Sequence, residues 1–256
     1  MIRLFTSHYP ERNERRCAEL LMSLASNLEN PAIDSVHLLL ERVDAPPEHK
    51  KLQTRRIDHR PTYNDFFQWA AELKPAESDL TVIANSDICF DASIKGMDHA
   101  LLPSQCAVLS RWNVGVEESP VLFDRNDSQD VWIFRGPLKD TQGTFCVGVP
   151  RCDNRILFEL KSAGYAVINP AFSIRAYHLH AGERVEYPTD NQLHFVDPPY
   201  AYMWPHNLWS LPRTLVHNLH HPEARIGWRL DRRMLARFLP LRIARRVASM
   251  IRRGTV

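Results

Sequence analysis

Strand-like and helix-like hydrophobic patterns alternate along the first 185 residues of the chain. Strand-like segments fall at residues 2–6, 36–40, 51–57, 80–84 and 107–109. Between them, residues 11–28 carry one helical stripe made of Cys17, Leu20, Leu21, Leu24 and Leu28. This alternation predicts an α/β fold, with a mainly parallel sheet flanked by helices. A sheet of this kind binds its ligands at the carboxyl ends of its strands.

Helix start signals predict two more helices in this part of the chain. Thr62, with Asp65 three residues later, is a variant of the capping box and predicts a helix that continues through Leu73. Asp91 predicts the start of another short helix.

A third helix start carries a carboxylate. Asp153 opens a short amphipathic helix that ends at Gly164, a residue typical of helix stops. Its apolar face consists of Ile156, Leu157 and Leu160. An ionised carboxylate at this end of a helix is favoured by about 0.3–1 kcal/mol. Asp153 is therefore either a candidate for chemistry or simply a helix cap.

Two histidines follow that helix. A short apolar run at residues 166–168 and an alternating pattern at 172–177 predict strands that lead to them. His178 and His180 are two residues apart, so their side chains point to the same face of a strand. This spacing suits a shared metal ion, and the alternative is a histidine-bearing strand packed within the fold.

The predicted strand at residues 80–84 ends in Asn85-Ser86-Asp87. A carboxylate at a strand end can bridge a divalent cation and a diphosphate, because such cations prefer hard oxygen ligands. The same three residues also make a good turn, which is the alternative interpretation.

Residues 128–134 form another candidate segment. Asp130 precedes an apolar strand, and Trp132 within it could stack on a sugar ring. Alternatively, a turn at residues 126–128 simply leads into a core strand. Arg111 and Trp112, after the strand at 107–109, are further candidates for lining a pocket.

The composition of the chain argues against several classes of protein but does not indicate a function. The chain has 256 residues and a formal net charge of +2, which gives no indication of a nucleic-acid partner. Its five cysteines form no CxxC pair and are odd in number, so we expect reduced thiols. There is neither a signal-peptide pattern nor an apolar run of the ~20 residues that a membrane span needs. We therefore expect a cytoplasmic protein.

The character of the chain changes near residue 187. We predict a catalytic domain at residues 1–187 and, at 188–256, an extension rich in Pro, Trp and His that ends in basic helices. Residues 229–253 combine arginines with an aliphatic stripe, which predicts contact with an anionic membrane surface, on its cytoplasmic side. The alternative is that the stripe packs on the catalytic domain.

The stretch from Asp153 to His178 resembles GT-A-type glycosyltransferases of the family 2 kind. In that family a Glu-Asp pair opens a helix that ends in Ala-Gly-Tyr, and a strand and a histidine follow. Here Cys152 stands in place of the Glu. Asn85-Ser86-Asp87 resembles the family's Asp-X-Asp motif, with Asn85 in place of the first Asp. The resemblance covers roughly residues 1–185 and implies a GT-A-like (Rossmann-like) fold.

The resemblance also implies roles for particular residues. Asp153 would be the general base, with Asp130 as a second catalytic candidate. Asp87 and His178, with His180 beside it, would bind Mn²⁺ or Mg²⁺. Acceptor contacts would come from Trp112, Trp132 and Asn154. Nucleotide-sugar contacts would come from Thr6, Ser7, Glu41, Arg56, Arg60, Asn85 and Asp87.

Three function classes remain open at this point. The first is a metal-dependent, inverting glycosyltransferase that moves a sugar from a nucleotide-diphosphate donor to a hydroxyl of a glycan or lipid-linked glycan, as in polysaccharide biosynthesis. The second is a module of the same fold that binds nucleotide or glycan without chemistry, motivated by Asn85 and Cys152. The third is a nucleotidyltransferase, which would need a glycine-rich loop after the first strand. The sequence Thr6-Ser7-His8-Tyr9-Pro10 lacks such a loop, so we place this class last.

Overall fold

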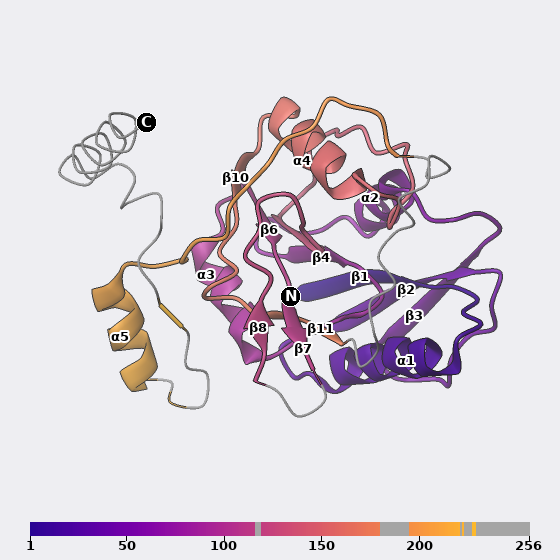
Figure 1. Ribbon diagram of the computed structural model, residues 1–256, viewed down its shortest axis with the longest axis horizontal. Coiled ribbons are helices and arrows are strands. Elements are labelled where there is room, and N and C mark those ends of the chain that lie inside the picture. Colours follow the sequence, from indigo (N-terminus) through magenta and orange to yellow (C-terminus); the bar gives the residue numbers. More distant parts are fainter. Residues whose placement is uncertain (116–118, 180–194, 221, 223–226, 229–256) are drawn as a thin grey trace, which may run out of the picture.

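Seven strands form the central sheet of the computed structural model, which describes residues 1–115, 119–179, 195–220, 222 and 227–228 (Figure 1). Across the sheet the order is β10 (Ala166–Ile168), β6 (Gln105–Leu109), β9 (Val131–Arg135), β4 (Leu80–Ala84), β1 (Ile2–His8), β2 (Ser35–Glu41) and β3 (Leu52–Ile57). β9 runs antiparallel to both of its neighbours, and the other pairs are parallel. The expected α/β fold with a mainly parallel sheet is confirmed.

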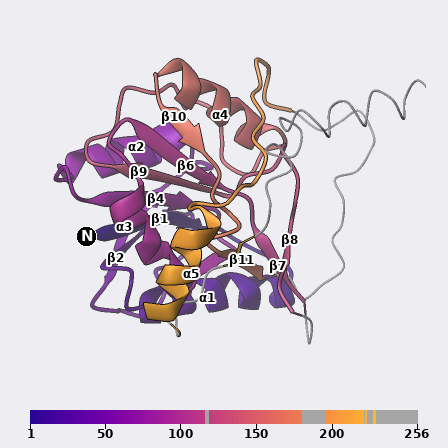
Figure 2. The same cartoon turned by 90° about the vertical axis from the view of Figure 1, so that its left-hand side faces the viewer.

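Helices cover both faces of this sheet. The helices that cover it are α1 (Glu14–Glu29), α2 (Tyr63–Glu72), α3 (Met97–Ala100), α4 (Cys152–Ser162) and the 3₁₀ helix η1 (Ala92–Gly96). Successive strand residues point to opposite faces, so Leu4 joins the core under α1, η1 and α3, while Phe5 joins the core under α2 and α4. Both side chains are fully buried. The views in Figures 1 and 2 show α4 and α2 on one side of the sheet and α1 on the other.

A smaller sheet brings distant segments together next to the main one. Its order is β5 (Ile88–Phe90), β11 (Ala176–Leu179), β7 (Trp112–Val114) and β8 (Val121–Leu122). β11 pairs antiparallel with β5, and His178 lies opposite Ile88. Because β5 begins directly after Asp87, this pairing carries His178 to that carboxylate.

The helix ends explain most of the local sequence signals. The capping box is present: Thr62 accepts a hydrogen bond from the Asp65 backbone N–H, and the Asp65 carboxylate accepts one from Thr62. Gly164 ends α4 with a left-handed φ of 81°, as expected of a helix stop. The cap interpretation of Asp153 is wrong, because Arg151 stands at the N-cap and no side chain caps this helix.

Two other expectations differ from the structure. The strand expected at residues 172–177 lies later, as β11, because residues 171–173 form a turn in which the Ser173 and Ile174 N–H groups donate to the Pro170 carbonyl. The basic helices expected within 229–253 lie outside the described residues, as does His180.

The described part of the C-terminal extension lies along the body before helix α5 (Leu211–His220). Backbone N–H groups of Ala201 and Met203 donate to the carbonyls of Asn154 and Asn126. In the part of the chain that the structure describes, we find no helix with the length and apolarity of a membrane span.

Candidate active site

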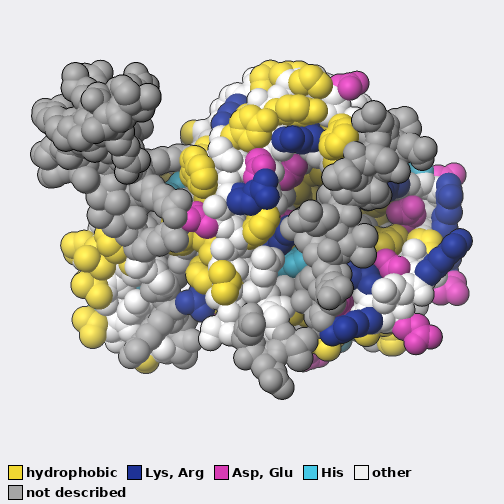
Figure 3. All heavy atoms as spheres, viewed as in Figure 1, with side chains coloured by type: hydrophobic (Ala, Val, Ile, Leu, Met, Phe, Trp, Pro, Cys, Tyr) yellow, Lys and Arg dark blue, Asp and Glu magenta, His cyan; other side chains and the backbone are white. Residues whose placement is uncertain are grey.

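A cavity of about 730 Å³ opens at the carboxyl edge of the parallel strands. Eight of the residues predicted from the sequence line it: Ser7, Glu41, Arg60, Asn85, Asp87, Arg111, Asp130 and His178. Ser7 and Glu41 stand near the ends of β1 and β2, and Asn85 follows β4, so one edge of the sheet positions them together. Basic and acidic side chains lie close together near the middle of the face shown in Figure 3. A cavity at this edge is the expected ligand site of such a sheet.

Asp87 is held by two positively charged or proton-donating groups. One oxygen of its carboxylate, Oδ2, lies 3.0 Å from His178 Nε2 and also accepts a hydrogen bond from Arg16 Nη2. Burial alone would raise the pKa of Asp87, but His178 and Arg16 outweigh it and hold that pKa well below its usual range. Asp87 is therefore an anion at neutral pH.

Oxygen acceptors next to these contacts could hold a cation. Asp87 Oδ1 and Asn85 Oδ1 are both buried and have no hydrogen-bond partner among the described residues. Together with His178 they supply the oxygen and imidazole donors that Mn²⁺ accepts. Within the described residues no group of three His, Cys, Asp or Glu side chains clusters around one point. An ion held by Asp87, Asn85 and His178 would therefore need its remaining ligands from substrate or water.

A buried ion pair forms the adjoining wall of the cavity. Arg111 Nη1 lies 3.2 Å and 3.3 Å from the two carboxylate oxygens of Asp130. Asn85 Nδ2 donates to Asp130 Oδ1 over 2.9 Å. Arg111 and Asp130 are each 6% exposed, so their charges are fixed in place with little solvent around them.

Asp153 lies beside this ion pair, in the first turn of α4. Its Oδ2 accepts a hydrogen bond of 3.3 Å from the backbone N–H of Gln129, the neighbour of Asp130. Burial, and then the negative charge of Asp130, raise the pKa of Asp153 to about 7. Asp153 itself does not line the cavity that holds Asp130. A carboxyl with this pKa can accept a proton near neutral pH.

The residues beneath Asp153 belong to the core. Trp132 is 1% exposed, and its ring lies 4.9 Å from that of Tyr63. The Tyr63 hydroxyl donates to Cys152 Sγ over 3.6 Å. Burial raises the pKa of Cys152 to about 12, so this thiol is neutral and unsuited to act as a nucleophile. The structure does not bring Trp132 to the cavity, and a ring enclosed on all sides cannot stack on a sugar.

The other predicted acceptor residues also lie away from the cavity. Trp112 donates from Nε1 to the Ala171 carbonyl over 2.8 Å, and the Arg175 guanidinium covers its ring at 5.3 Å. Asn154 is 1% exposed at the start of α4. The contacts of Trp112 fix its side chain within the fold, and burial keeps Asn154 out of the cavity.

Among the predicted nucleotide contacts, two also stand apart. Arg56 is on β3 with a side chain that is 68% exposed, and it pairs with Asp44 at 3.3 Å. Thr6 is buried near the end of β1, next to Ser7, which does line the cavity. Ser7 Oγ and Ser86 Oγ are 3.0 Å apart, which links the ends of β1 and β4.

Arg60 is positioned by a glycine turn. Its Nε donates to the Val147 carbonyl over 2.9 Å. Gly148 has a φ of +73°, and a Cβ added there would lie 2.7 Å from Arg60 Nη2. The turn therefore needs glycine both for its backbone conformation and for the close approach of this guanidinium.

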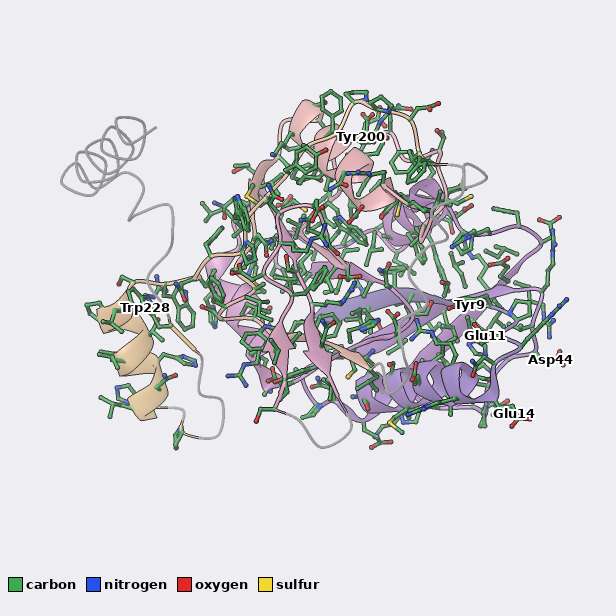
Figure 4. The ribbon with its side chains drawn as sticks, viewed as in Figure 1. Tyr9, Glu11, Glu14, Asp44, Tyr200 and Trp228 are labelled. Carbon is green, nitrogen blue, oxygen red and sulfur yellow. The ribbon has the colours of Figure 1, made fainter. Side chains whose placement is uncertain are left out.

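Sequence reasoning missed the contribution of the loop after β1 and of the first turn of α1. Tyr9, Glu11, Arg15 and Arg16 all line the cavity, and Figure 4 shows Tyr9 and Glu11 at this end of the molecule. Charged residues at a helix start are usually solvated, so their pattern gave no signal. Only the pairing of Arg16 with Asp87, 71 positions away, reveals a role for it.

Comparisons with known proteins concern the fold. No protein-family model matches the chain, and no curated protein matches it. Among solved structures it is similar to the mannosyltransferase PcManGT from Pyrobaculum calidifontis, in complex with GDP-Man and Mn²⁺, with 12% identity and a TM-score of 0.43. That match covers 72% of this chain and 58% of the mannosyltransferase.

Two further solved structures are similar at a comparable level. One is the Francisella tularensis 2-C-methyl-D-erythritol 4-phosphate cytidylyltransferase, with 12% identity, a TM-score of 0.35, and coverage of 53% of this chain and 73% of that one. The other is S. aureus TarS 1–349, with 13% identity, a TM-score of 0.36, and coverage of 80% and 60%. All three likenesses have TM-scores below 0.5.

Proposed function

We propose that this chain is a glycosyltransferase that moves a sugar from a nucleotide-diphosphate donor to a hydroxyl group of a glycan or lipid-linked glycan. The observation that carries this proposal is the group of charged side chains that lines a cavity at the carboxyl edge of the sheet, with Asp153, whose pKa is raised, beside it. The cavity supplies charged groups for a diphosphate, and Asp153 supplies a base of suitable strength for a hydroxyl.

The donor half of the proposal uses the strand ends. Glu41 would accept hydrogen bonds from the nucleoside, and Arg60 would face the phosphates from the Gly148 turn. Asp87, Asn85 and His178 would hold a divalent cation, Mn²⁺ or Mg²⁺, which neutralises the charge that develops on a departing diphosphate. The same residues would orient the sugar relative to Asp153.

The acceptor half uses Asp153 as a general base. Its carboxylate would remove the proton of the acceptor hydroxyl as the oxygen attacks the anomeric carbon and the bond to the diphosphate breaks. Attack from the face opposite the leaving group gives inversion at that carbon. The Gln129 N–H holds the carboxylate in place, and burial together with the charge of Asp130 keeps its pKa high enough for it to act as a base near neutral pH.

The second candidate is a module of this fold that binds a nucleotide sugar without transferring it. One observation favours it: Arg16 and His178 already occupy one oxygen of Asp87. Hydrolysis separates the two candidates, because transferases with an open donor site release sugar slowly to water.

The experiment is a panel of nucleotide sugars incubated with Mn²⁺ and the full chain, with nucleoside diphosphate release as the readout. The proposal expects slow release from at least one donor, and a loss of that release in Asp87→Asn. Arg56→Gln is the matched control, because Arg56 lies outside the cavity and should leave release unchanged. Binding of a donor without release in the wild type would favour the binding module.

A further inference from the structure

Arg16 holds the position beside Asp87 that the cation of the proposed function would need. It reaches across from the first turn of α1, where Nη1 lies 3.0 Å from Glu19 Oε2 and Nη2 contacts Asp87 Oδ2. The side chains of Arg16 and Asp87 are only 23% and 13% exposed, so water screens the pair weakly. A positive charge is therefore already built into this end of the cavity.

A divalent cation and this guanidinium repel each other when both lie against one carboxylate. Asp87 Oδ1 is the acceptor without a hydrogen-bond partner among the described residues, and Oδ2 is shared by Arg16 and His178. An ion on Oδ1 would thus sit within a few ångströms of the Arg16 charge. Such an ion binds well only if the guanidinium moves away or its charge is neutralised.

A nucleoside diphosphate offers Arg16 a better partner. Guanidinium groups bind phosphate oxygens through two parallel hydrogen bonds, and a diphosphate carries more charge than one carboxylate. Arg15 and the N-cap residue Asn13 line the same cavity as Arg16, at the start of the 16-residue helix α1, whose N-terminus also favours anions. A diphosphate at this point would draw Arg16 away from Asp87.

We propose that Arg16 competes with the divalent cation for Asp87, and that a bound nucleoside diphosphate relieves this competition by pairing with Arg16. This proposal rests on the proposed function in one respect, the role of Asp87 as a cation ligand. Its consequence is that the free protein binds the cation weakly and that cation and nucleotide strengthen each other's binding. By linkage, the factor is the same in both directions.

The first test measures Mn²⁺ binding to the full chain without nucleotide, by electron paramagnetic resonance of free Mn²⁺. Arg16→Gln should bind Mn²⁺ at least ~10-fold more tightly than wild type, because the competing charge is gone. Arg12→Gln is the matched control, since it removes the same charge from an exposed residue outside the cavity, and it should bind like wild type. Adding Asp87→Asn to Arg16→Gln should remove the gain.

A second measurement uses the unaltered protein. The thermal shift from Mn²⁺ together with GDP or UDP should exceed the sum of the shifts from Mn²⁺ and from the nucleotide alone, and Arg16→Gln should reduce this excess.

The outcomes separate the two proposals. If Arg16→Gln binds Mn²⁺ no more tightly than Arg12→Gln while Asp87→Asn weakens binding, the competition is refuted and Asp87 remains a cation ligand. If Asp87→Asn changes Mn²⁺ binding in neither background, or Mn²⁺ binds to none of the variants, the cation site itself is refuted. Additive thermal shifts in the wild type also contradict the competition.

Discussion

Asp153 shows how burial and a neighbouring acidic group change the protonation of a carboxyl group. Asp130 forms an ion pair with Arg111. Asp153 has no such partner among the described residues, and burial together with the charge of Asp130 raises its pKa to about 7. A carboxyl group whose pKa lies near neutral pH is typical of sites that move protons. Two predictions at the scale of this residue follow from its pKa.

Transfer should depend on pH through Asp153. The base must be ionised to accept a proton, so kcat/KM should rise with pH up to about 7 and level off above it. Initial rates between pH 5.5 and 8.5, at saturating Mn²⁺, measure this profile. A kcat/KM that stays flat across that range would show that Asp153 is not the base.

The raised pKa of Asp153 should also make the stability of the protein depend on pH. In the folded state the pKa of Asp153 is about 7, above the ordinary value of 3.8, so between these values the folded state binds more protons than the unfolded state. The ionised carboxylate therefore costs stability as the pH rises through this window, by at most about 4 kcal/mol, since each pKa unit corresponds to about 1.4 kcal/mol.

Asp153→Asn removes this cost and keeps an oxygen that can accept the Gln129 N–H. We expect its free energy of unfolding to match or fall below that of wild type near pH 4 and to exceed it at pH 8, as measured by urea denaturation at both values. A difference between the two proteins that does not change with pH would contradict the raised pKa.

At the scale of elements, local patterns in the sequence predicted individual strands and helix starts. They did not predict the contacts between segments that are far apart in the chain. The strand at Leu80–Ala84 and the capping box at Thr62 follow from apolar runs and helix-start chemistry. The smaller sheet and the contact between Arg16 and Asp87 join segments far apart in the chain, and no local spacing records them. Trp132 shows the same limit, because the sequence pattern around a strand tryptophan is the same whether its ring faces a pocket or the core, where Trp132 lies.

The glycine turn that holds Arg60 gives a prediction at this scale. Gly148→Ala should destabilise the fold by about 1–2 kcal/mol, because alanine is strained at positive φ. It should also weaken nucleoside diphosphate binding several-fold, because the new Cβ would displace the Arg60 guanidinium. Gly164→Ala is the matched control: its φ is +81°, but its Cβ would meet only Lys139 Nζ at 3.7 Å. Equal nucleotide affinity in the two variants, by calorimetry, would contradict a role for Arg60.

At the scale of the whole molecule, the C-terminal extension bears on where the protein is located in the cell. Helix α5 displays apolar side chains, among them Leu215, Val216 and Leu219 with 54%, 55% and 81% exposure. The helix lies at the left of the body in Figure 1 and in front of it in Figure 2. Beyond it, residues 229–253 lie outside the described residues, and their contact with an anionic membrane surface stays a prediction from the sequence.

Truncation tests that prediction. We expect the full chain to co-sediment with anionic vesicles at physiological salt and a version that ends at Pro240 to bind them clearly less, because each basic residue near such a surface contributes about 1 kcal/mol. Helix α5 and residues 229–240 remain in both proteins, so the comparison isolates residues 241–256 and their five arginines. Equal binding of the two proteins would refute the proposal.

The most direct test of the central claim is the activity of Asp153→Asn with the donor that the nucleotide-sugar panel identifies. We expect transfer by Asp153→Asn to fall by at least about 100-fold, because that is the usual contribution of a general base. Its affinity for the nucleoside diphosphate with Mn²⁺ should stay within a factor of about two of the wild-type affinity. Ser162→Ala, an exposed change in the last turn of the same helix, should leave both quantities unchanged. Transfer by Asp153→Asn at the wild-type rate would contradict the assignment of Asp153 as the base, and with it the proposed mechanism.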